Sequence, residues 1–248
     1  MFNYLLGEAY RVLRKKSMYI YFGSFALLYL LLVFIRSGMG NEATQIKQDA
    51  ETLAAFFPAV VGGYLFAAFY TDDLNAKNLT TLIGFGLGKT KIIIAKLIMV
   101  IIFGVLIFAL IPVFMWAAFS VFNGAVPLEA FSTLYAWALK ALLEAIAFSA
   151  VSAIIVYGLQ RATFGMVTYL LLSLGVIGQL LAALFSWDLI NSIAPNLSEH
   201  LMSGITIRII LGMLVGEPLI LPIVEYLIYV AIAVALSVLA FKKKELEF

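Results

Sequence analysis

The sequence predicts an all-α integral membrane protein with six transmembrane helices. Of its 248 residues, 64% are hydrophobic and only 12% are charged, and the mean hydropathy is +1.08. That composition leaves too little polar surface to cover a soluble globule of this length. The apolar runs are about 20 residues long, as a hydrocarbon core of about 30 Å requires, and they lack the alternation of period two expected of a membrane β-barrel.

We expect residues 1–248 to form one transmembrane domain. An amphipathic interfacial helix is expected over residues 1–17, where apolar and charged side chains fall largely on opposite faces. This helix either touches a cytoplasmic partner or only anchors the topology. Residues 188–218 are expected to form an outer re-entrant or interfacial hairpin, because their apolar stretch is too short for a seventh span. The six spans are predicted at about residues 18–35, 52–70, 92–119, 131–157, 163–187 and 219–241.

Two features inside the spans bear on packing. Small residues recur every four positions in the second and fourth spans, which lets a neighbouring helix approach closely. Pro112 is expected to kink the third span near its outer end. The small residues are Ala55, Ala59, Gly63 and Ala67 in the second span, and Ala141, Ala145, Ser149 and Ala153 in the fourth.

Basic residues are distributed unevenly around the spans, and Lys and Arg are retained on the cytoplasmic side of a bilayer. If both termini lie inside, only Arg36, Lys47 and Arg208 fall outside, and Lys140 lies within a span. We therefore expect a multi-pass protein of a bacterial cell membrane with cytoplasmic termini, and the lack of cysteine fits that compartment. The basic residues placed inside are Arg11, Arg14, Lys15, Lys16, Lys77, Lys89, Lys91, Lys96, Arg161, Lys242, Lys243 and Lys244.

The polar segment after the second span is expected to carry a short helix that projects into the cytoplasm. Asp72 or Asp73 is a suitable N-cap, and Gly84 is suited to end the helix. Apolar residues lie between them at roughly helical spacing. The residues expected to contact a cytoplasmic partner are Asp72, Asp73, Leu74, Lys77, Leu79, Leu82 and Ile83.

This segment resembles the coupling segment of the ABC-2 type transporter permeases. In that family an acidic residue opens a coupling helix, and a turn, a basic residue and a Lys at the head of the third helix follow it. The six-span plan and the hairpin before the last span are also similar. The hydrophobic-Pro turn often seen in the family is replaced here by Gly86-Leu87-Gly88. The corresponding positions in this sequence are Asp72 or Asp73, the turn 84–88, Lys89 or Lys91, and Lys96.

The resemblance implies a transport subunit that is not itself an enzyme. Two permease subunits, identical or related, would pair with two cytoplasmic ABC ATPase subunits. Those partners would hold ATP and Mg²⁺, so no cofactor is expected on this chain, and no nucleic acid is expected as a partner. Small outer loops make the chain similar to permeases that export antimicrobial or cytolytic peptides or confer immunity to them. Hydrophobic or amphipathic substrates are therefore expected, with lipids and hydrophobic drugs also open.

One stretch looks at first like a nucleotide-binding P-loop. The motif requires Gly, four residues and then Gly-Lys-Thr, but Ile83 stands where the first Gly should precede Gly88-Lys89-Thr90. The motif also follows a β-strand, whereas a membrane span comes first here. We therefore expect ATP hydrolysis on a separate subunit.

Charged residues inside the spans mark the candidate transport cavity. A central charge costs roughly 2.5–3.5 kcal/mol on insertion scales. Lys140 and Glu144 lie one turn apart in the fourth span and are expected to pair, either to stabilise packing or to line a transport cavity. Glu225, in the outer half of the last span, is the third candidate, unless it belongs to an ordinary solvated rim. His200 alone cannot supply the three or four ligands of a zinc site.

The main alternative is an ion-coupled secondary transporter. That class predicts broken helices, inverted repeats and paired midplane carboxylates, whereas the sequence offers one central acidic residue and no obvious internal repeat. A metal-dependent intramembrane enzyme would need clustered His and Glu residues. A membrane scaffold would leave the projecting segment unexplained.

Overall fold

The computed structural model describes residues 2–36, 42–71, 78–124, 128–187 and 196–243. Across these ranges the chain is almost entirely helical and has no strand, which confirms the all-α class. Five of the described helices are long and apolar enough to cross a membrane, or six spans result if one bent helix pair is counted as a span. The elements are α1 (Phe2–Leu13), α2 (Lys16–Arg36), α3 (Glu42–Phe57), η1 (Pro58–Gly62), α4 (Gly63–Phe66), η2 (Ala67–Thr71), α6 (Asn78–Gly84), α7 (Lys89–Asn123), α8 (Leu128–Leu159), α9 (Ala162–Ser173), α10 (Val176–Phe185), η3 (Leu197–His200), α12 (Met202–Val215) and α13 (Ile220–Lys243).

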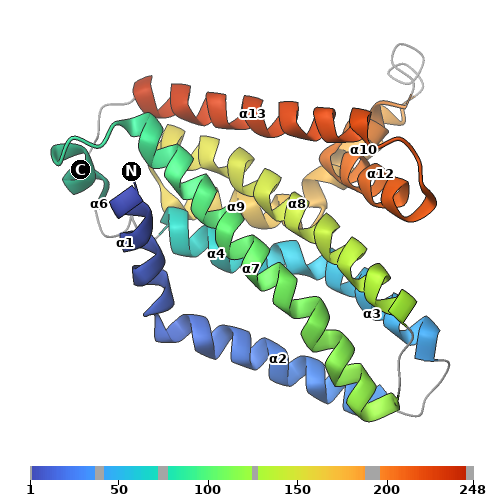
Figure 1. Ribbon diagram of the computed structural model, residues 1–248. Coiled ribbons are helices and arrows are strands. Elements are labelled where there is room, and N and C mark those ends of the chain that lie inside the picture. The colour runs from blue at the N-terminus through green and yellow to red at the C-terminus, as the bar shows by residue number, and fades with distance from the viewer. Residues whose placement is uncertain (1, 37–41, 72–77, 125–127, 188–195, 244–248) are drawn as a thin grey trace.

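Helix α8 is the centre of the bundle and packs against α3, α7, α9, α12 and α13. Its predicted stripe of small residues is buried: Ala141 and Ser149 are fully enclosed, and Ala145 and Ala153 nearly so. Small side chains let the surrounding helices approach its backbone from several sides. By contrast, only 6% of the apolar window of α2 is buried, against 67% for α8. Helix α2 therefore lies at the periphery, as Figure 1 shows.

The second span alternates between α-helical and π-helical segments, running α3, η1, α4 and η2. A π turn accommodates an additional residue, so it changes the angular position of everything that follows. The predicted four-residue stripe is therefore kept only in part: Gly63 is buried, but Ala55 is exposed.

Three side chains from other helices donate hydrogen bonds to backbone carbonyls of the π segments. The Tyr21 hydroxyl of α2 donates to the Val60 carbonyl at 2.7 Å, and the Tyr169 hydroxyl of α9 donates to the Pro58 carbonyl at 2.7 Å. Arg11 Nη2 of α1 donates to the carbonyl of Ala68 at 2.8 Å. The second span is thus tied directly to three neighbouring helices.

The third and fifth predicted spans differ in continuity. Helix α7 continues without a break across Pro112. The segment predicted as one span over residues 163–187 is instead the pair α9 and α10, bent by 59°. Gly175 lies between them with φ of 75°, in the left-handed region that glycine enters without steric cost. This glycine lets the chain change direction inside an apolar stretch.

The hairpin expected before the last span is described only in its second half, since residues 188–195 lie outside the described ranges. Helix α12 has 14 residues, about 21 Å at 1.5 Å per residue, which is too short to cross a core of about 30 Å. Its side chains Ile205, Thr206 and Ile209 are buried, and the helix packs against α8 and α13. The short helix is therefore part of the bundle.

One end of the bundle gathers α1, α6, the beginning of α7 and the end of α13 (Figure 1). The Lys89 ammonium at the start of α7 donates to the Phe241 carbonyl at 3.0 Å. The ring of Tyr157, near the end of α8, lies 4.7 Å from the ring of Phe241. Basic residues that the sequence places on the inner side thus share this end, which we call the basic end.

Candidate functional site

The expected pair of charges is present in the middle of the bundle. Lys140 Nζ lies 2.6 Å from Glu144 Oε1, one turn apart on α8. The Thr206 hydroxyl of α12 donates to the same carboxylate oxygen at 3.0 Å. Thr206 is fully buried, and only 5% of Glu144 is exposed. The sequence analysis did not identify Thr206 as a partner of Glu144. The available signal was a hydroxyl group among the apolar residues of a short helix.

This pair borders a cavity of about 460 Å³. Side chains of α8, α12, α13 and the α9–α10 break contribute to its wall, and the bend at Gly175 helps to shape it. Its size lies within the range of small-molecule sites, and its wall combines apolar surface with a few polar groups, as such sites do. The polar side chains in the lining are Lys140, Glu144, Ser173, Gln179, Ser198, Ser203 and Tyr229.

Glu225 does not line this cavity and has different partners. Its carboxylate forms an ion pair with Arg208 of α12 and lies 3.5 Å from Nδ1 of His200 in η3. Arg208 also donates to the carbonyl of Glu199. Glu225 therefore joins α13 to η3 and α12, and His200 belongs to this cluster.

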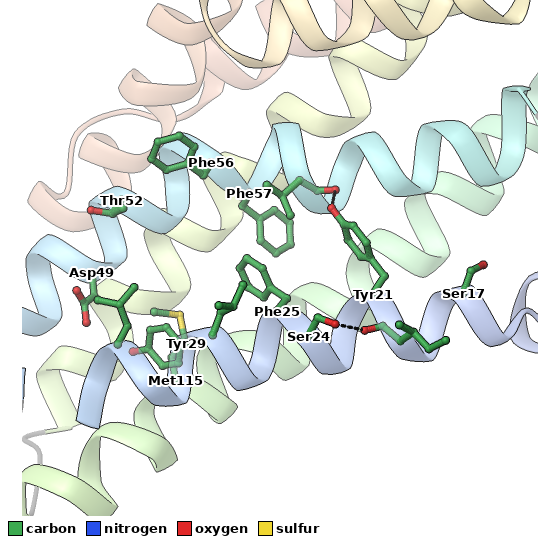
Figure 2. A pocket seen from close by; sticks show the side chains of 14 residues that line it. Ser17, Tyr21, Ser24, Phe25, Tyr29, Asp49, Thr52, Phe56, Phe57 and Met115 are labelled. Atoms are coloured by element: carbon green, nitrogen blue, oxygen red, sulfur yellow. Dashed lines mark hydrogen bonds between the residues drawn. The ribbon is translucent and has the colours of Figure 1, made fainter. Parts of the chain in front are cut away.

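A second hollow of about 840 Å³ lies between α2 and the α3–η1 segment (Figure 2), and we call it the α2 groove. Figure 2 shows Phe25 and Phe57 facing each other across its middle, with Ser17 and Asp49 at opposite ends. Almost all of its lining is apolar. The sequence did not reveal this groove, because α2 is apolar around its whole circumference and no single face stands out.

The segment predicted to couple to a partner is described from Asn78 onward. Helix α6 ends at Gly84, where the sequence predicted a stop. Leu79 is 2% exposed, and Leu82 and Ile83 pack partly buried against the core, so these apolar side chains face this chain. Phe85, by contrast, is 82% exposed and was missed from the sequence. The remaining residues expected to couple, Asp72, Asp73, Leu74 and Lys77, lie outside the described residues.

The glycine-rich stretch after α6 is a helix stop and not a phosphate loop. Gly86 has φ of 83°, the Leu87 amide donates to the Leu82 carbonyl, and the Gly86 amide donates to the Ile83 carbonyl. These two bonds define a Schellman motif, which ends a helix on a left-handed glycine. Gly88 then serves as the N-cap of α7. Helix-ending geometry thus explains why glycines are spaced in this way.

A buried ionic cluster joins α1 to α7 at the basic end. Lys96 is 1% exposed, and its Nζ lies 3.4 Å from Glu8 Oε2. The same carboxylate oxygen lies 2.6 Å from Arg11 Nη2. The sequence predicts that the charged side chains of residues 1–17 lie on one polar face of an interfacial helix, but the Glu8 side chain is buried. Helix α1 is therefore docked on the bundle by charge as well as by apolar contact.

Comparison with known proteins adds no assignment to this geometry. No protein-family model matches the chain, and no curated protein matches it. The function must therefore be inferred from the residues and contacts described above.

Proposed function

We propose that this chain is the transmembrane permease subunit of an ABC exporter in a bacterial cell membrane. It would move hydrophobic or amphipathic molecules outward, with antimicrobial or cytolytic peptides as the favoured class. ATP hydrolysis would occur on a separate cytoplasmic subunit. The observation that carries the proposal is the buried pair Lys140–Glu144 on the wall of a cavity inside a bundle of membrane-length helices.

Charges retained at such depth need a reason, because burial of an ion pair removes its hydration and often gives no net stability. A cavity that offers a charge pair beside apolar side chains can accept a molecule that carries both kinds of surface. Lys140 can contact an anionic group of the substrate and Glu144 a cationic group, while Phe148 and Leu172 contact its apolar part. Amphipathic substrates match this lining best.

The basic end supports the idea of an external motor. Helix α6 and the Schellman motif lead directly into α7, and Lys96 of α7 is bound to α1. A force applied by a partner at α6 would therefore reach the third span and the N-terminal helix together. Substrate release requires that the two resulting states differ in affinity for the substrate. A second permease subunit, identical or related, would complete the assembly.

The test is to identify the ATP-binding protein that co-purifies with this chain and to reconstitute the chain with and without it. Such a partner should be recovered, and proteoliposomes containing both proteins should move a fluorescent cationic amphipathic peptide only when ATP is hydrolysed. An ATPase variant that binds but does not hydrolyse ATP is the matched control. Failure of the two chains to associate, together with no ATP-dependent transport, would contradict the proposal.

One observation favours a second candidate, an ion-coupled secondary transporter. The α9–α10 pair is a broken helix, and its break borders the same cavity as Lys140 and Glu144. Broken helices that line a midplane site are characteristic of secondary transporters. The same proteoliposomes separate the two functions, since a secondary transporter moves its substrate on a proton or sodium gradient without the ATPase.

A further inference from the structure

Aromatic contacts near both ends of the α2 groove hold α2 in place. The groove runs along α2 from Ser17 to Leu32, which is about 22 Å at 1.5 Å per residue. Near one end, the ring of Tyr21 stacks on that of Tyr64 at 4.9 Å. Near the other end, Tyr29 contacts Phe114 at 6.1 Å. These aromatic contacts hold α2 against α4 and α7, so the groove is a defined feature and not a loosely placed helix.

Three of the hydroxyl groups along the groove donate to backbone carbonyls. Ser24 donates to Ile20 at 2.7 Å, and Thr52 donates to Gln48 at 2.7 Å. The Tyr21 hydroxyl donates across the groove to Val60. A water molecule needs two to four polar partners to be held, and the rings of Phe25 and Phe57, which face each other across the middle of the groove, offer none. An empty groove would forfeit dispersion contacts along its walls, so in a bilayer it should contain hydrocarbon.

The Ser17 end of the groove is basic. Arg14 and Lys16 are exposed directly before Ser17, at the bend between α1 and α2. The Tyr19 hydroxyl fixes this bend by donating to the Leu13 carbonyl at 2.8 Å. Asp49 lies at the opposite end of the groove (Figure 2). An anionic group is therefore favoured at the Ser17 end.

We propose that the α2 groove binds an anionic membrane phospholipid. One acyl chain lies in the groove, and the head group lies at the Ser17 end near Arg14 and Lys16. Lys and Arg near a membrane surface attract anionic head groups. This site is separate from the cavity at Lys140 and Glu144, and it requires only that the chain spans a membrane. It does not depend on the exporter function.

The first test asks whether the groove retains lipid. Each protein is reconstituted in vesicles of phosphatidylglycerol and phosphatidylethanolamine, extracted, washed in detergent and analysed by native mass spectrometry. Leu28→Trp fills the groove and should reduce the retained phospholipid about tenfold. Leu27→Trp is the matched control and should retain it, because Leu27 is equally exposed but does not line the groove, with 60% against 62% for Leu28. If Leu28→Trp fails to fold, Ser24→Trp fills the same groove.

The second test asks which end holds the head group. Arg14→Gln/Lys16→Gln should lower the ratio of phosphatidylglycerol to phosphatidylethanolamine in the retained lipid several-fold. Lys91→Gln/Lys243→Gln removes the same charge from exposed positions of the basic end and should leave the ratio unchanged.

Three outcomes would overturn the proposal. Equal lipid loss in Leu28→Trp and Leu27→Trp would show only annular lipid. Full retention in Leu28→Trp would show that the groove holds none. Conversion of a dimer to a monomer by Leu28→Trp, measured by light scattering, would show that a second copy of this chain fills the groove.

Discussion

Gly62 marks the point at which the second span meets the fourth and fifth predicted spans most closely. A Cβ atom added there would lie 2.1 Å from the Tyr169 hydroxyl oxygen and 2.8 Å from the Cβ of Ala145. Both distances are far below ordinary contact, so the neighbours would have to move. The hydrogen bond from Tyr169 to the Pro58 carbonyl is the first interaction that such a movement would break.

We therefore expect Gly62→Ala to destabilise the protein by about 1–3 kcal/mol, the usual cost of overpacking a tight core. Gly23→Ala is the matched control: Gly23 is exposed on α2 with no atom within 4 Å of the added Cβ, so alanine should stabilise the helix by up to about 1 kcal/mol. Unfolding in mixed detergent micelles measures both. Equal stability of the two variants would contradict the packing at Gly62.

Glu144 is the residue on which the transport proposal depends most directly. Glu144→Gln keeps the size of the side chain and can still accept from Thr206, but it leaves the Lys140 ammonium without its anion. We expect peptide transport to fall about tenfold, equivalent to about 1.4 kcal/mol, with membrane insertion and ATPase assembly intact. Glu217→Gln, at an exposed position, should have no effect. Unchanged transport in Glu144→Gln would contradict the proposal that the substrate passes through this cavity.

The residue pattern predicted the pair Lys140–Glu144 because two charges four positions apart on a helix share a face. It could not predict Thr206, whose position next to Glu144 depends on how the short helix α12 packs against α8. Glu225 was grouped with the cavity by depth alone, whereas Arg208 and His200 engage it elsewhere. Contacts within one helix follow from spacing; contacts between helices require the tertiary arrangement.

Among the elements, α1 illustrates how a docked helix differs from a surface helix. The Glu8 carboxylate of α1 forms ion pairs with both Lys96 and Arg11, and Lys96 is almost completely buried. Loss of the shared anion would leave two positive charges close together, whereas loss of Lys96 would leave the pair of Glu8 and Arg11 intact.

We therefore expect Glu8→Gln to destabilise the protein more than Lys96→Met does. Breaking a buried pair by removing one partner costs about 3–5 kcal/mol, and the value for Lys96→Met should be lower because Arg11 remains. The double variant should be more stable than Glu8→Gln alone. Thermal unfolding of the three variants measures the order, and a smaller loss in Glu8→Gln than in Lys96→Met would exclude the shared-anion arrangement.

The elements themselves were predictable to different degrees. The buried stripe of α8 and the stop at Gly84 follow from small residues and glycine in regular positions. The break at Gly175 also had a local signal, but glycine is common in transmembrane helices, so its presence alone does not distinguish a bend from a straight span. The π segments of the second span had no local signal in the sequence. Because of them, Ala55 and Gly63 of the predicted stripe do not lie on one buried face.

At the scale of the whole molecule, the lack of cysteine makes the topology directly testable. Single cysteines at Phe85, 82% exposed at the basic end, and at Val121, 78% exposed near the other end of α7, provide a matched pair. In intact cells a membrane-impermeant maleimide should label Val121→Cys and should label Phe85→Cys only after permeabilisation. The reverse pattern would place the basic end outside and contradict the coupling role proposed for α6.

Composition and charge were sufficient to predict helices of membrane length and a shared end for the basic residues. They were insufficient for the two hollows, because a cavity is the space that several helices leave between them. The α2 groove in particular depends on where α2 lies, which its ring contacts with α4 and α7 determine.

The two π segments give the second span an unusual mechanical property. Relaxing either segment to regular α-helix would turn the part beyond it by about 100° around the axis, the angle of one residue. Relaxing η1 would turn the Ala68 carbonyl, which lies beyond it, relative to the Pro58 and Val60 carbonyls within it, so Arg11, Tyr169 and Tyr21 could not all keep their bonds. Rotation of this span about its axis would therefore act on α1, α2 and α9 together.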